Sequence, residues 1–187
     1  QPLIPDISLL DFNNINNLEK ITTQTACVIA ETIQGEAGII EPANNFLTAL
    51  RNKCTETGAL LILDEVQTGF GRTGAFFGFN NYKISPDIVL FAKEMGGGMP
   101  IGAFVSDKKI MNVLSTSPPL GHITTFGGHP VNCAAANACI DVLKKENWIA
   151  SAEKKGLLLE NILLQSNHIK EIRRAGLFFA IEMKSPE

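Results

Sequence analysis

Apolar residues in this 187-residue chain fall into two kinds of run: short stretches that are apolar at almost every position, and longer stretches with a helical repeat. The short stretches make up most of 26–30, 59–63 and 87–92. A strand with one face in water alternates apolar and polar residues, so these three are expected to be strands covered on both faces of a sheet. A further strand is expected at 101–105, after a run of glycines.

The helical repeats predict two long helices ahead of Trp148. One covers about 45–57, and Gly58 follows it where a C-terminal cap is expected. Its apolar stripe consists of Phe46, Leu47, Leu50 and Cys54. The other helix runs from about 130 to 145 and begins with Pro130, because proline is favourable at the first position of a helix.

Weaker patterns predict smaller elements. These are a short strand at 7–12, a short helix at 14–23, a loop containing Pro118 and Pro119, a leucine-rich helix after Trp148, and short strands near 169–173 and 177–183. The alternation of helices and strands indicates an α/β fold with a mostly parallel sheet and helices on both of its faces. We expect residues 1–148 to belong to this large domain and residues 149–187 to begin a smaller α+β domain.

Charge and composition narrow the class of protein. The 16 basic and 19 acidic residues are interspersed and give a net charge of −3, which argues against a nucleic-acid or membrane-surface partner. No apolar run is long enough for a membrane span. The four cysteines lack metal-ligand spacing and are expected to be small core residues of a cytoplasmic protein. The missing initiator methionine and the end just after a strand pattern lead us to expect a fragment.

Two chemically useful residues follow two of the predicted strands. Asp64 ends the run at 59–63, and Lys93 ends the run at 87–92. Ligands of open α/β sheets gather at the carboxyl ends of strands, so an amine and a carboxylate are expected at one sheet edge. Pyridoxal phosphate needs a covalent anchor and an ionic partner for its ring nitrogen. We expect Lys93 to be buried among apolar neighbours, which would make its amine easier to deprotonate.

Each of these residues also has a plain structural interpretation. A lysine can extend from a strand end toward water, and an aspartate can cap the turn after a strand. Gln67 could hydrogen-bond a ring hydroxyl or be an ordinary loop residue. The loop 121–130 could hold a phosphate or be a glycine turn. His122, His129 and Cys133 match no common metal site, and no metal is expected.

Taken together, several motifs resemble those of the class III aminotransferases of the ornithine, acetylornithine and 4-aminobutyrate type, within the fold-type I pyridoxal-phosphate-dependent transferases. The matching blocks are 31–38 (ETIQGEAG), 63–74 (LDEVQTGFGRTG), 86–90 (PDIVL), 92–93 (AK), 96–103 (GGGMPIGA), 125–130 (TFGGHP) and 174–177 (RAGL). They span nearly the whole chain in family order. The resemblance implies the large cofactor domain of that fold plus the start of its small C-terminal domain.

The resemblance also implies roles for individual residues. Lys93 would bond covalently to the cofactor, Asp64 would face the pyridine nitrogen, and Gln67 would lie near the ring hydroxyl. Thr125 would reach a phosphate in the neighbouring subunit's site, which makes a homodimer part of the expectation. Glu36 would pair with a substrate-site arginine and release it when the second substrate arrives.

Two positions depart from the family pattern. Thr32 stands where proline is usual, and His129 where asparagine is usual; both departures bear on loop geometry more than on reaction class. The role of Glu31 stays open. In the family, the phosphate-binding Gly/Ser loop, the ring-stacking aromatic residue and a carboxylate-binding arginine come before the matching blocks.

The expected reaction belongs to amino-acid metabolism. It moves an amino group from a terminal-amine donor, such as acetylornithine, ornithine or 4-aminobutyrate, to a 2-oxo acid such as 2-oxoglutarate, and the sequence does not choose among these donors. One rival hypothesis is a nucleotide-hydrolysing domain that binds magnesium through Asp64 and Glu65, although the chain has no Gly-x-x-x-x-Gly-Lys-[Ser/Thr] loop. Another is a structural fragment without catalytic activity.

Overall fold

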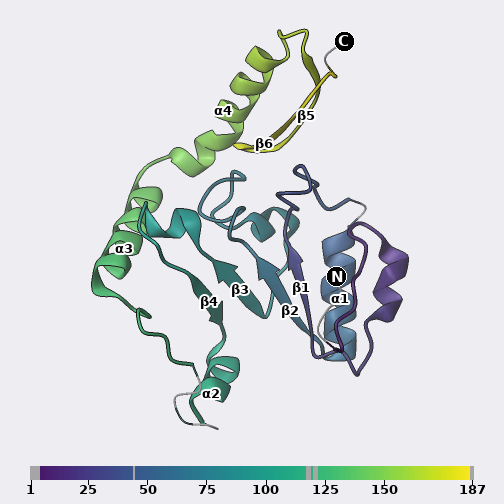
Figure 1. Ribbon diagram of the computed structural model, residues 1–187, viewed down its shortest axis with the longest axis vertical. Helices are drawn as coiled ribbons and strands as arrows, with labels where there is room; N and C mark the ends of the chain where they lie inside the picture. The colour runs from purple at the N-terminus through teal and green to yellow at the C-terminus, as the bar shows by residue number, and fades with distance from the viewer. Residues whose placement is uncertain (1–4, 44, 117–118, 120–121, 186–187) are drawn as a thin grey trace.

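The described residues form two sheets that share no strand. The computed structural model describes residues 5–43, 45–116, 119 and 122–185. The larger sheet has the order β1 (Cys27–Glu31), β2 (Leu60–Asp64), β3 (Ile88–Phe91), β4 (Ala103–Ser106), and the smaller pairs β5 (Ile169–Ala175) with β6 (Phe178–Met183). The helices are α1 (Phe46–Thr57), α2 (Lys108–Thr116), α3 (Pro130–Lys145) and α4 (Trp148–Leu163), with short 3-10 helices η1 (Ile15–Lys20), η2 (Gly78–Tyr82) and η3 (Lys93–Gly96) (Figure 1).

The larger sheet is mostly parallel, as expected. β1, β2 and β3 run in the same direction, and only β4 is antiparallel. In register, Asp64 lies opposite Glu31 on one side and Leu90 on the other. The carboxyl ends of the three parallel strands therefore form one edge, and in Figure 1 β1 and β2 point toward the part of the chain formed by α4, β5 and β6.

Helix α1 closes the main core and matches its expected bounds. All four residues of its apolar stripe are buried, and they pack with Leu61 and Leu63 of β2. Gly58 ends the helix at φ 81°, a left-handed conformation that glycine adopts without strain, and its N–H donates to the Cys54 carbonyl. The spacing of these four apolar side chains thus specifies both the helix and the face of the helix that is buried.

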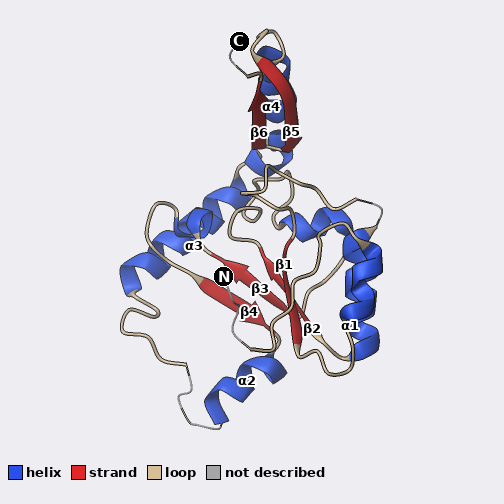
Figure 2. Ribbon diagram, turned by 45° about the vertical axis from the view of Figure 1, so that its right-hand side comes forward, coloured by secondary structure: helices blue, strands red, loops and turns tan. Residues whose placement is uncertain are grey.

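A second cluster joins α3 to the same face of the sheet. Phe91 of β3, Met95 of η3 and Ala136 of α3 are buried together. Phe91 projects on the same side as Leu63, because Leu63 pairs with Val89 two residues earlier. The expectation of helices on both faces is therefore wrong for the described part of the chain. No described helix contributes to a core on the other face, where Ile29 is 64% exposed. Figure 2 shows the helices and strands from a second side.

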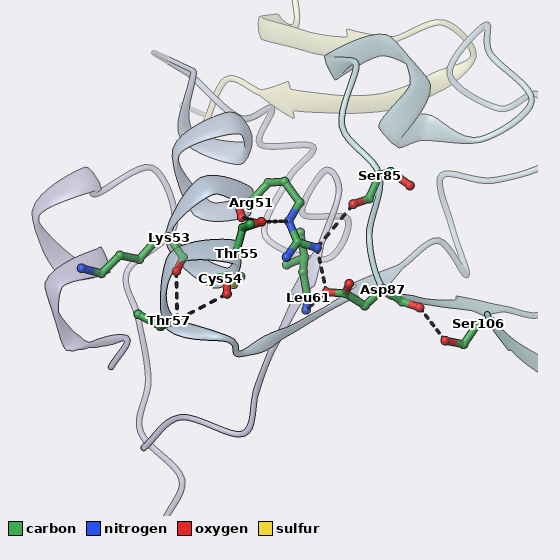
Figure 3. Close-up of polar contacts among 9 residues, drawn as sticks. All are labelled: Arg51, Lys53, Cys54, Thr55, Thr57, Leu61, Ser85, Asp87 and Ser106. Carbon is green, nitrogen blue, oxygen red and sulfur yellow. Dashed lines mark hydrogen bonds and ion pairs between the residues drawn. The ribbon is translucent and has the colours of Figure 1, made fainter. Parts of the chain in front are cut away.

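Asp87 forms hydrogen bonds to several elements next to the amino end of β3. Its Oδ2 accepts hydrogen bonds from Arg51 Nη1 of α1 and from the Leu61 N–H of β2, both at 2.7 Å (Figure 3). Its carbonyl accepts from Ser106 Oγ of β4, also at 2.7 Å. One residue at the start of β3 therefore connects a helix and both neighbouring strands.

Three local expectations differ from the structure. Residues 7–12 form no strand, and the helix expected at 14–23 is only η1. Helix α2 was missed; it follows Asp107, whose Oδ1 accepts from the Ile110 N–H at 2.8 Å, a helix-capping signal that the sequence does contain. Pro118 lies outside the described residues, and Pro119 lies in a turn.

The cysteines were expected in the core, and only Cys54 is buried there; Cys27 is exposed, and all four are free thiols. None of the described helices combines the length and apolar character needed to cross a bilayer.

Candidate active site

The two residues predicted to carry the chemistry lie at the carboxyl edge of neighbouring parallel strands. Asp64 is the last residue of β2 and is half-buried, and Lys93 follows the end of β3 by two residues. The Val66 N–H donates to Asp64 Oδ1 at 2.8 Å, which is the turn-capping bond of the structural interpretation. Capping engages one oxygen and leaves the other as an acceptor, so the two interpretations of Asp64 are compatible.

Lys93 differs from the expectation in its environment. The side chain is exposed rather than buried, because the chain turns at Ala92 into η3 and carries it out of the sheet. Its φ of 41° lies in the left-handed region, which is strained for lysine by roughly 1–3 kcal/mol. Hydrogen bonds from the Met95 N–H to the Ala92 carbonyl (3.0 Å) and from the Gly97 N–H to the Glu94 carbonyl (3.2 Å) hold the turn. Such strain is a feature of functional sites that residue type alone does not reveal.

Gln67 and Glu36 meet, although they come from different loops. Gln67 Nε2 donates to Glu36 Oε1 at 3.2 Å. Gly35 makes the approach possible, because a Cβ at that position would lie 3.0 Å from Gln67 Nε2. Glu31, whose role the sequence left open, accepts from the Gly35 N–H at 2.8 Å. The carboxylate of Glu31 thus stabilises the turn that brings Glu36 to Gln67.

Thr125 is exposed in the loop before α3. Among the described residues, no hydrogen bond links it to Asp64, Gln67 or Lys93. The nearby His122 packs edge-on against Phe104 of β4, with ring centroids 5.1 Å apart. The phosphate role of Thr125 stays a prediction.

A buried carboxylate lies next to Asp64, and from the sequence it was assigned a role only in the rival magnesium hypothesis. Glu65 is 1% exposed and accepts hydrogen bonds from the Gly78 N–H (2.6 Å), the Phe79 N–H (2.9 Å) and the hydroxyl of Thr32. Burial raises the pKa of Glu65, and these hydrogen bonds oppose that rise. Thr32, where the family usually has proline, is completely buried. Its hydroxyl joins the end of β1 to the loop after β2.

The hydrogen bonds that Glu65 accepts from Thr32, Gly78 and Phe79, here called the Glu65 network, argue against a magnesium ion bound by Asp64 and Glu65 together. Successive side chains of an extended segment point to opposite sides, so Glu65 enters the core while Asp64 faces the open side of the sheet. Core donors already occupy both Glu65 oxygens. Within the described ranges, no group of three or more His, Cys, Asp or Glu side chains is arranged to hold a metal ion.

The edge of the sheet therefore presents an exposed amine, a carboxylate with one free acceptor oxygen, and an amide. This donor set fits a cofactor that needs a covalent anchor, a partner for a ring nitrogen and a hydrogen bond to a ring substituent. It contains no nucleophile paired with a base.

The family model described as aminotransferase class-III matches residues 6–187. The chain is 41% identical to the acetylornithine aminotransferase of Methanopyrus kandleri over 189 aligned residues, covering all of this chain and 48% of that protein. It is 42% identical to the [LysW]-aminoadipate semialdehyde/glutamate semialdehyde transaminase of Sulfolobus acidocaldarius, covering 98% and 48%. The chain thus spans about half the length of these relatives.

Solved structures agree with the sequence comparison. An ornithine aminotransferase from Toxoplasma gondii, with partial occupancy of PLP at its active site, matches with a TM-score of 0.89 at 34% identity, over 98% of this chain and 44% of that one. The acetylornithine aminotransferase of Elizabethkingia anophelis matches with a TM-score of 0.84 at 35% identity, over 94% and 45%. Because the family model covers nearly the whole chain and the fold agrees with it, this chain belongs to the class-III aminotransferase family.

Proposed function

We propose that this chain carries the lysine and the ring-nitrogen partner of a pyridoxal-phosphate-dependent aminotransferase. The observation that supports this most directly is the delivery of Lys93 and Asp64 to one edge by adjacent parallel strands, in a chain of this family. The cofactor, when bound, supplies the aldehyde that accepts an amino group and the ring that withdraws electrons.

Each residue has a defined task in this proposal. The amine of Lys93 would hold the cofactor covalently and, once freed by an incoming amino group, would move a proton at the substrate carbon. The carboxylate of Asp64 stabilises the protonated ring nitrogen, because an adjacent negative charge favours the charged form. The amide of Gln67 would lie near the ring hydroxyl and donate a hydrogen bond to it.

Glu36 is proposed as the residue that admits the second substrate. The hydrogen bond from Gln67 to Glu36 is 3.2 Å long and lies at the surface. Glu36 can therefore give up this bond and pair with an arginine instead at little cost in free energy. Thr125 is proposed to act in the site of a second subunit, which suits its exposure and its distance in the chain from the other candidates. A homodimer is therefore part of the proposal.

The donor class is proposed from the relatives. The names of the Methanopyrus and Toxoplasma proteins refer to acetylornithine and ornithine, so we propose a terminal-amine donor and a 2-oxo acid acceptor, with neither a nucleic acid nor a membrane as partner. We place the activity in the cytoplasm, where free thiols persist. We also propose that residues 1–148 belong to the cofactor-binding domain and 149–187 to a smaller domain.

Covalent trapping tests the assignment of Lys93. The full-length protein is incubated with pyridoxal phosphate, reduced with borohydride and digested, and the modified lysine is identified by mass. We expect the label on Lys93 and no label or amino-group transfer in Lys93→Ala. Lys83→Ala is the matched control, because Lys83 is also exposed and also has a positive φ, 55°. Labelling elsewhere, or normal transfer by Lys93→Ala, would overturn the proposal.

A further inference from the structure

The residue after Lys93 is held from three directions. Glu94 Oε1 pairs with Arg72 Nη2 at 2.9 Å, in an ion pair whose side chains are 38% exposed for Arg72 and 28% for Glu94. The Glu94 carbonyl accepts from the Gly97 N–H and from Cys139 Sγ of α3, each at 3.2 Å. Both the side chain and the backbone of Glu94 are therefore fixed beside the strained Lys93.

Arg72 is in turn held by the turn between β5 and β6. The Leu177 N–H donates to the Arg72 carbonyl at 2.9 Å. Gly176 lies so close that a Cβ there would be 2.8 Å from the same carbonyl oxygen. On its other side the turn meets α4, because a Cβ on Gly156 would lie 2.1 Å from the Gly176 carbonyl oxygen. A continuous set of close contacts thus runs from α4 through this turn to Arg72 and Glu94.

The strained conformation of Lys93 gives these contacts a consequence. A non-glycine residue keeps a positive φ only where its surroundings hold it there, and otherwise relaxes to a conformation that aims the side chain elsewhere. The pair is too exposed for its charge to contribute much to stability, so its effect is geometric. If Glu94 is released, the Lys93 amine loses its fixed starting position.

We propose that Arg72 and Glu94 are positioning residues for Lys93, and that the turn of Ala175, Gly176 and Leu177 sets where Arg72 lies. This proposal rests on the proposed function, in which Lys93 is the cofactor-binding amine. It assigns a task to two residues outside the donor set of Lys93, Asp64 and Gln67. It also makes the β5–β6 hairpin part of the machinery that orients the lysine.

The test measures the rate at which Lys93 captures pyridoxal phosphate in the full-length protein, by the new absorption band and by borohydride-trapped mass. We expect Arg72→Ala and Glu94→Ala each to slow capture by about tenfold or more, as misplacement of a reacting group does. The double variant R72E/E94R, which restores the pair in reverse, should recover most of the rate. Glu19→Gln is the matched control, because Glu19 also forms a surface ion pair, with Lys53 of α1, and lies outside both η3 and the β5–β6 hairpin.

The two single variants also separate position from charge. Removing Arg72 makes the net charge near Lys93 one unit more negative, and removing Glu94 makes it one unit more positive. A purely electrostatic influence would change the capture rate in opposite directions, which would overturn the proposal, whereas loss of positioning slows both. Equal rates in wild type, Arg72→Ala and Glu94→Ala would overturn it as well. If wild-type Lys93 captures nothing, the proposed function itself fails, and the positioning role falls with it.

The contribution of the turn is tested separately with Gly156→Ala, which leaves the ion pair chemically intact. We expect capture to slow because the added methyl group displaces Gly176 and with it Arg72. Normal capture by a folded Gly156→Ala protein would refute the part of the proposal that concerns the turn. If thermal unfolding shows that this variant does not fold, Leu177→Pro, which removes the N–H that bonds the Arg72 carbonyl together with the leucine side chain, takes its place with the same expected result.

Discussion

Replacing Thr32 with valine tests whether the buried Glu65 network holds the loops of the site together. The substitution keeps the shape of the side chain and removes the hydroxyl that donates to Glu65. Thr32 is 0% exposed and Glu65 is 1% exposed, so no water can take the place of the lost donor. Glu65 keeps the N–H groups of Gly78 and Phe79, at 2.6 and 2.9 Å.

The expected loss follows from the kind of bond removed. A hydrogen bond to a charged group contributes about 1.5–3 kcal/mol, and valine leaves no cavity, so we expect a loss of about 2 kcal/mol in the free energy of unfolding. For a protein of this size that lowers the melting temperature by about 4–8 °C. Thermal unfolding followed by circular dichroism measures it. Thr32→Ser, which keeps the hydroxyl and loses one buried methyl group, should cost only about 1 kcal/mol.

The pH dependence provides a second check. Burial raises the pKa of Glu65 in the folded state above its ordinary value of 4.5, so the folded protein takes up this proton before the unfolded chain does. Protonation of Glu65 therefore adds stability as the pH falls from the folded pKa toward 4.5. A protonated Glu65 depends less on the Thr32 hydroxyl, so the deficit of Thr32→Val should shrink on acidification. A deficit that is constant with pH, or equal in Thr32→Ser, would refute this reasoning.

Two further predictions concern the frame around the site. Asp87→Ala removes the acceptor of both Arg51 and the Leu61 N–H, and should lower the free energy of unfolding by about 2–3 kcal/mol, measured by urea titration; a loss below about 0.5 kcal/mol would contradict the role of Asp87 in the sheet edge. Hydrogen bonding by Arg174 lowers the pKa of Glu153 below 4.5, so this pair stabilises the protein above that pH and is lost as the pH falls through the lowered pKa. Glu153→Gln should therefore flatten the acid side of a pH–melting-temperature profile, and an unchanged profile would show that the pair contributes nothing.

The local pattern of apolar and polar residues was sufficient to predict most of the helices and strands. The bounds expected for α3 agree with the structure, because its proline start and its repeat are contained within the helix itself. The strands ending near Asp64 and Phe91 are one residue from their expected ends. The strand expected at 7–12 failed, because a short apolar pattern specifies no partner and no neighbouring strand pairs with it.

The candidate site was predicted in part. The types of residue at the strand ends, and the resemblance carried by their neighbours, led to Lys93 and Asp64. The exposure and positive φ of Lys93 were not predicted, because they depend on how the chain leaves β3 and enters η3. The meeting of Gln67 with Glu36 depends on a glycine contact between two loops.

The sequence by itself determined where most of the helices and strands form and which chemical groups follow the strands, because both are properties of short stretches of chain. Only the tertiary structure decided which groups meet. Thr32 reaches Glu65 across 33 residues, and Arg72 reaches Glu94 across 22, because strand order and turn geometry bring those segments together. Adjacent residues can therefore have opposite environments, with Asp64 at the open edge of the sheet and Glu65 in the core, since an extended chain turns successive side chains to opposite faces.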